Sequence, residues 1–107
     1  MQCEVYQAGE CCVVKLGGDI DMHASPTARK AILQCIRDNH SVIVDLAAVS
    51  YIDSSGIATL VEGLQAAKAK RLDFGLFGAS AAALRVLKLA RLEKVFTIHP
   101  ALPASDA

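Results

Sequence analysis

The chain has 107 residues, 53% of them hydrophobic and none of them tryptophan, and its eleven basic residues balance eleven acidic ones. This length fits one domain with a single core of small and aliphatic side chains. Balanced charge gives no overall field for nucleic acid or an anionic membrane, which disfavours direct nucleic-acid binding. No stretch approaches the ~18 apolar residues of a membrane span, and the N-terminus lacks a signal-peptide pattern, so we expect a cytoplasmic protein without membrane insertion.

Two short apolar runs at the start of the chain predict a β-hairpin. They cover residues 2–7 and 11–16, and the segment 8–10 between them contains a glycine and has the character of a turn. Residues 17–24 follow as a predicted loop, because the regular apolar pattern stops there.

A first helix is predicted to begin at Ser25. Serine is a favoured N-cap, and Pro26 follows at the first helical position, where proline is well tolerated. Apolar residues then recur at helical spacing, which predicts one buried face, at Ala28, Ile32, Cys35 and Ile36. The helix is expected to end at residues 39–40.

Residues 41–46 form a continuous β-branched run typical of a strand covered on both faces, so we expect it in the middle of the sheet. A loop is predicted over 47–52. A second helix should follow, with Asp53 or Ser54 as its N-cap. Its apolar stripe is Ile57, Leu60, Val61 and Leu64.

The last third of the chain repeats the alternation. A strand is predicted over 73–77, a helix opening at 78–80, and a last strand over 95–98. Strands alternating with helices indicate an α/β fold with a mixed sheet of four or five strands and helices packed against it. We expect one domain over 1–99 and a flexible C-terminal tail over 100–107.

Four cysteines, at positions 3, 11, 12 and 35, raise the alternatives of a disulfide or a metal site. None forms a C-x-x-C pair and none has a histidine at ligand spacing. Free cysteine packs as a small hydrophobic residue, so we expect core thiols.

Asp53, Ser54, Ser55 and Gly56 stand where a loop meets the second helix. Unpaired backbone N–H groups and the helix dipole make that end locally positive. A phosphate on one of these serines would add about −1.5 to −2 charges, which could switch a docking surface without unfolding the domain. Spacing alone favours a simpler interpretation, in which the four residues only cap the helix.

The sequence predicts no catalytic residue, metal or cofactor. The serines lack a G-x-S-x-G elbow, and the three histidines have no evident orienting partner. A hydrolase would need His23 to approach Ser54 and an oxyanion hole besides. Asp19 and Asp21 could hold a metal, but no further ligands stand near them in sequence, so a turn or a partner contact is the favoured role.

Three segments together resemble the STAS family, and especially its bacterial anti-sigma factor antagonists. They are Val42-Ile43-Val44-Asp45-Leu46, Tyr51-Ile52-Asp53-Ser54-Ser55-Gly56-Ile57 and Gly18-Asp19-Ile20-Asp21. The likeness covers nearly the whole chain and continues through Gly78, Ser80 and the Leu-rich segment after them.

The resemblance implies a partner-switching cycle that regulates transcription. The unmodified antagonist binds an anti-sigma factor that is also a serine kinase, and phosphorylation ends the binding. Ser54 matches the phosphorylated serine, with Ser55 as the fallback, while ATP and Mg²⁺ belong to the kinase. The expected partner-binding residues are Asp19, Asp21, His23, Asp53, Ser54, Ser55, Gly56 and Ile57.

One departure from the family pattern follows the motif glycine. Antagonists commonly continue as Leu-Gly, where this chain has Ile57-Ala58, and the added methyl group could hinder close docking. Related STAS proteins also serve as accessory subunits of ATP-binding-cassette transporters for phospholipids. That alternative would make a transporter ATPase and permease the partners.

Overall fold

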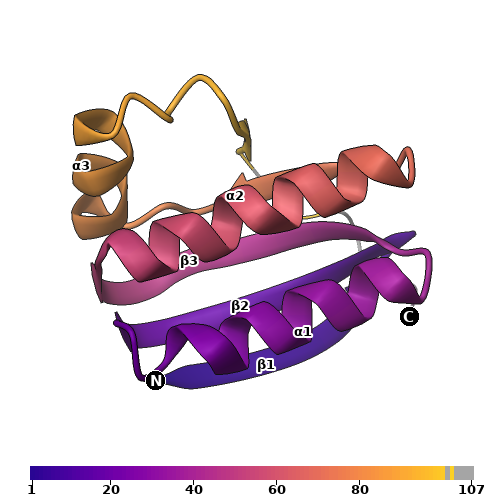
Figure 1. Cartoon of the computed structure of the whole chain (residues 1–107), viewed down its shortest axis with the longest axis horizontal. Helices are drawn as coiled ribbons and strands as arrows, with labels where there is room; N and C mark the ends of the chain where they lie inside the picture. The colour runs from indigo at the N-terminus through magenta and orange to yellow at the C-terminus, as the bar shows by residue number, and fades with distance from the viewer. Residues whose placement is uncertain (101, 103–107) are drawn as a thin grey trace.

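Five strands and three helices follow one another along the chain (Figure 1). The strands are β1 (Gln2–Ala8), β2 (Cys11–Ile20), β3 (Ser41–Ile52), β4 (Phe74–Phe77) and β5 (Thr97–His99); the helices are α1 (Ser25–Arg37), α2 (Ser54–Ala69) and α3 (Ala81–Leu89). This computed structural model describes residues 1–100 and 102, so most of the tail predicted over 100–107 lies outside the described residues. None of the helices among the described residues is long and apolar enough to cross a membrane.

The strands form one mixed sheet in the order β1-β2-β3-β4-β5. The first two strands pair in antiparallel fashion as the predicted hairpin, and all later pairs are parallel. The sheet is mixed, as predicted. The strand beginning at Ser41 lies at its centre, which confirms the second prediction.

Two central strands are longer than their sequence pattern predicts. The loop expected over 17–24 is wrong for residues 17–20, because β2 continues to Ile20. The loop expected over 47–52 is wrong throughout, because β3 continues to Ile52. These extensions pair with each other, with shifts in register just before Gly17 and just after Gly18. Backbone pairing holds them together where the apolar alternation has ended. The last strand covers 97–99, so it begins two residues later and ends one residue later than predicted.

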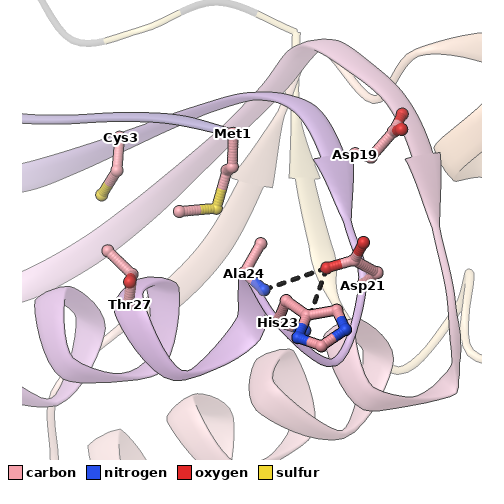
Figure 2. A pocket seen from close by; sticks show the side chains of 7 residues that line it. All are labelled: Met1, Cys3, Asp19, Asp21, His23, Ala24 and Thr27. Atoms are coloured by element: carbon pink, nitrogen blue, oxygen red, sulfur yellow. Dashed lines mark hydrogen bonds between the residues drawn. The ribbon is translucent and has the colours of Figure 1, made fainter.

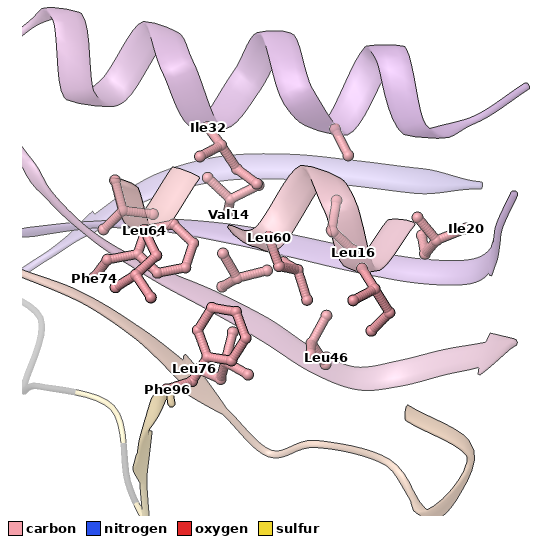
Figure 3. Close-up of a cluster of buried hydrophobic side chains, with 14 of the residues drawn as sticks. Val14, Leu16, Ile20, Ile32, Leu46, Leu60, Leu64, Phe74, Leu76 and Phe96 are labelled. Carbon is pink, nitrogen blue, oxygen red and sulfur yellow. The ribbon is translucent and has the colours of Figure 1, made fainter. Parts of the chain in front are cut away.

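Helices α1 and α2 lie side by side over the sheet and enclose the main core (Figures 1 and 3). Side chains from both helices interlock with those of the central strands, among them Ile32, Leu60, Leu64, Val14, Leu46 and Leu76. Gly63 lets α2 approach closely, since a Cβ there would lie 2.7 Å from Phe74 Cε2 and 2.8 Å from Ile32 Cγ2.

A second, smaller apolar cluster consists of Ala8, Val13 and Ile43, on the strands β1, β2 and β3. Alternation along β2 points Val13 away from Cys12 and Val14, which belong to the main core. Three half-buried side chains pack against this cluster: Cys11, Phe77 and Leu102. Leu102, which lies within the predicted tail, therefore contacts the folded domain.

Cys12 and Cys35 are joined in a disulfide, so the prediction of four core thiols is wrong for this pair. Sequence spacing could not reveal it, because the partners are 23 residues apart and meet only when α1 packs on β2. Cys3 and Cys11 are free and half-buried.

Candidate functional site

The carboxyl ends of β2 and β3 lie next to each other and carry the two polar segments that the sequence singled out. Ile20 pairs with Ile52 at the end of the two strands. The backbone N–H of Asp53 then donates to the carbonyl of Ile20, with an N···O distance of 3.2 Å. The loop 21–24 and the start of α2 therefore meet at one edge of the sheet, as parallel strands require.

Asp53 is the N-cap of α2, which decides between the two residues that sequence allowed. Its Oδ1 accepts hydrogen bonds from the backbone N–H groups of Ser55, at 2.9 Å, and Gly56, at 3.2 Å. The hydroxyl of Ser55 also donates to this oxygen at 2.5 Å. The Ser55 hydroxyl is the main cause that lowers the pKa of the Asp53 carboxyl, and the backbone N–H groups of Gly56, Ser55 and Met22 lower it further. A fixed negative charge thus stands at the start of the helix.

The two serines of the motif have different environments. Ser55 is half-buried, and its hydroxyl donates a hydrogen bond to Asp53. Ser54 is exposed, and within residues 1–100 and 102 its hydroxyl has no hydrogen-bond partner. Of the two, Ser54 presents the hydroxyl that a modifying enzyme can reach.

Asp21 shapes the loop that leads into α1 (Figure 2). Its Oδ1 accepts from the backbone N–H groups of His23 and Ala24, each at 3.0 Å. The N-cap is Ala24 and makes no side-chain cap, so the prediction of Ser25 as the cap is wrong. Ser25 is instead the first helical residue, and it is buried. A serine cap is not needed, because the Asp21 carboxylate accepts from the N–H of Ala24 and the Asp21 carbonyl accepts from the N–H of Ser25.

An open depression of about 680 Å³ lies beside this loop. Figure 2 shows the side chains that line it: Met1, Cys3, Asp19, Asp21, His23, Ala24 and Thr27. Among the described residues no group of three or more His, Cys, Asp or Glu side chains is placed to hold a metal ion. A hydrolase would need a hydrogen bond between the His23 ring and Ser54, and the described residues contain none.

Two predicted contact residues face the interior. Gly56 is buried, and a Cβ there would lie 2.6 Å from Ile52 Cγ1 and 3.0 Å from Ile20 Cγ2. Ile57 is 8% exposed and belongs to the core. Both residues therefore pack inward, where Gly56 allows close approach to Ile20 and Ile52 and Ile57 belongs to the core. Ala58, the departure from the family pattern, is exposed.

Sequence reasoning missed two exposed apolar side chains at this edge. Met22 is 68% exposed and lies in the loop whose backbone reaches Asp53. Tyr51 is 51% exposed and pairs with Asp19 across β2 and β3. The available signal was a large side chain next to the polar residues of each motif, Met22 beside Asp21 and Tyr51 two residues before Asp53.

Comparisons with known proteins match this arrangement. The STAS domain family matches residues 2–104. An anti-sigma-B factor antagonist of Listeria monocytogenes is 25% identical over 84 residues, which is 78% of this chain and 74% of that protein. An anti-sigma-F factor antagonist of Mycobacterium tuberculosis is 28% identical over 95 residues, covering 84% and 77% of the two chains. The crystal structure of an anti-sigma factor antagonist from Mycobacterium paratuberculosis superposes with a TM-score of 0.80 at 27% identity, covering 94% of this chain and 86% of that one.

Proposed function

The chain belongs to the STAS domain family, and from this membership we propose that it is an anti-sigma factor antagonist that regulates transcription by binding a protein partner. The observation that carries the proposal is the pair of neighbouring serines, one tied to the N-cap and the other free and exposed. The relatives that match bear the name of antagonists, and this supports the antagonist role over that of a transporter subunit. The partner would be an anti-sigma factor with serine kinase activity.

We infer that phosphorylation of Ser54 ends the binding. The added phosphate would bring about −1.5 to −2 charges onto a helix N-terminus, where backbone N–H groups tolerate them. Asp53 stands next to it with its charge held by hydrogen bonds, and Asp21 occupies the facing loop. The domain would remain folded while the surface that the partner approaches became strongly negative.

The exposed residues around Ser54 suggest the chemistry of the partner. Asp19 contributes a carboxylate, and Met22 and Tyr51 contribute apolar surface, although the whole chain has no net charge. A complementary partner surface would combine lysine or arginine side chains with apolar ones. Such an interface would form in the cytoplasm, where the kinase and sigma factor act, and it would need no catalysis by this chain.

The test compares variants of Ser54 in binding to the partner. Affinity purification with crosslinking and mass spectrometry would identify the partner and any phosphate on the peptide 53–57. We expect Ser54→Ala to bind as the wild type does and Ser54→Asp to bind about tenfold or more weakly, because charge is added where the partner must approach.

Ser55→Ala is the matched control. It removes a hydroxyl from the same turn without adding charge, so it should lower helix stability slightly and leave the response to phosphorylation intact. Equal affinity for the Ala and Asp variants of Ser54 would contradict the switch, and co-purification with a permease and its ATPase would favour the transporter role.

A further inference from the structure

The disulfide ties the last turns of α1 to the start of β2. Cys12 is the second residue of β2, and Cys35 lies two residues before the end of α1. Their Cα atoms are 6.4 Å apart, within the range of about 4.4–6.8 Å that disulfides bridge. The proposed partner site lies at the other end of α1, where the loop 21–24 enters the helix.

An apolar groove leads to this pair. It has a volume of about 320 Å³ and runs between the edge strand β1 and α1. Both cysteines belong to its lining, together with Val5, Gln7, Ala31, Gln34, Asp38 and His40. Cys12 and Cys35 are only 2% and 5% exposed, and both line this groove, so a small molecule that enters it comes next to the pair.

The two free cysteines are poorly suited to opening the disulfide. Cys11 packs against the cluster on the other face of the sheet, and Cys3 lines the depression beside Asp21. Burial raises the pKa of both thiols, and for Cys11 the charges of Asp73 and Glu10 raise it further. Because the thiolate is the nucleophile in exchange, an external thiol must start the reaction.

A second tie holds the same end of α1 without depending on sulfur. The Lys70 ammonium group donates to the carbonyl oxygens of Ile36, at 2.9 Å, and Arg37, at 3.2 Å. Ile32 and Ile36 are also buried in the main core. Opening the disulfide would therefore leave α1 seated on the sheet, which reversible chemistry requires.

We propose that Cys12 and Cys35 form a reversible redox site that an external dithiol opens through this groove. One thiolate of the dithiol attacks a sulfur of the pair and breaks the S–S bond, giving a mixed disulfide. The second thiol of the reagent resolves it. Two electrons and two protons pass to the protein, Cys12 and Cys35 become thiols, and the reagent becomes a disulfide. The site is independent of the proposed partner binding.

The first experiment places the whole protein in buffers of defined ratios of reduced to oxidised dithiothreitol. After quenching and denaturation, alkylation with mass spectrometry should find two free thiols at the oxidising end and four at the reducing end. The melting temperature should fall on the order of 10 °C on reduction, because a cross-link over 23 residues is lost. Cys35→Ser should abolish this difference and Cys11→Ser should retain it.

The second experiment measures how fast dithiothreitol reduces the folded protein. Ala31→Phe fills the groove and should slow reduction about tenfold, whereas Lys30→Phe, on the same helix but outside the groove lining, should not. Four free thiols under oxidising conditions would overturn the proposal. So would a rate of reduction equal to the rate of global unfolding, since the disulfide would then be a sealed structural cross-link.

Discussion

One carboxylate oxygen, Oδ1 of Asp53, organises the whole first turn of α2. It accepts from two backbone N–H groups and from the Ser55 hydroxyl, and this leaves Ser54 as the serine with a free hydroxyl. A residue that caps a helix thereby also decides which neighbour is available for modification. The simple capping interpretation and the phosphorylation interpretation of this motif are therefore compatible, because one supplies the geometry that the other uses.

Replacement of Asp53 should separate the cap from the charge. Asp53→Ala removes the acceptor and should lower the melting temperature by roughly 5 °C. Asp53→Asn keeps an N-cap acceptor and should lower the melting temperature by less. The carboxyl has a folded pKa below its ordinary 3.8. Its charge therefore stabilises the fold above that pH, and this contribution is lost as the pH falls through the lower folded value.

Thermal unfolding from pH 7 down to pH 2 checks this expectation. The difference in melting temperature between the wild type and Asp53→Asn should be largest at pH 7 and should shrink toward pH 2. Asp19→Asn is the control, as it changes an exposed carboxylate at the same edge of the sheet. A difference that stays constant over this range of pH would show that the charge of Asp53 contributes nothing to stability.

The residues of the site were easier to predict than their exposure. Asp53 and Ser54 follow from helix-start chemistry and from the family resemblance. Gly56 and Ile57 belong to the same motif, and only the packed structure shows that they face Ile52 and the core. A motif read along the chain cannot separate residues that contact a partner from residues that seat the helix carrying them.

At the scale of elements, α2 is seated by two glycines on its buried side, Gly56 and Gly63. Each occupies a place where a Cβ would come closer than 3.0 Å to a neighbouring side chain. Glycine costs a helix about 1 kcal/mol relative to alanine, so its presence here is explained by the close approach of α2 to the sheet and to α1.

Gly63→Ala should destabilise the protein by about 1–3 kcal/mol despite its better helix propensity, because the methyl group would overlap Phe74 and Ile32. Urea denaturation measures the change. Gln65→Ala, at an exposed position of the same helix, should stay within about 0.5 kcal/mol of the wild type. Phe74→Leu should partly rescue Gly63→Ala by vacating space. A stabilised Gly63→Ala variant would show that the neighbours yield easily.

The positions of helices and strands were predictable where the apolar side-chain pattern determines the element. They were less predictable where pairing with another strand determines it. The hairpin, the two long helices and the central strand follow from alternation and helical spacing. No such pattern exists at Gly17-Gly18 or over 47–52. These segments become strand because they pair with each other between β2 and β3. The disulfide has the same origin, since its two halves are brought together only by the packing of α1.

At the scale of the molecule, the sheet separates two apolar clusters of unequal size. Leu102 packs against the smaller cluster of Ala8, Val13 and Ile43, beyond the last strand. Leu102→Ala should lower the free energy of unfolding by about 1 kcal/mol, as expected for a half-buried leucine. Denaturant unfolding checks this. No effect of Leu102→Ala would show that the contact of Leu102 with this cluster contributes nothing to stability.

The strand order β1-β2-β3-β4-β5 is also the order of synthesis. Each strand therefore adds to the free edge of the sheet formed by its predecessors, and none has to be inserted between strands already paired. A chain leaving the ribosome can bury its core progressively from the N-terminus, which shortens the time that apolar strands stay exposed. The edge where β2 and β3 end, and with it Ser54, is complete once α2 has emerged, before β4 and β5 have left the ribosome.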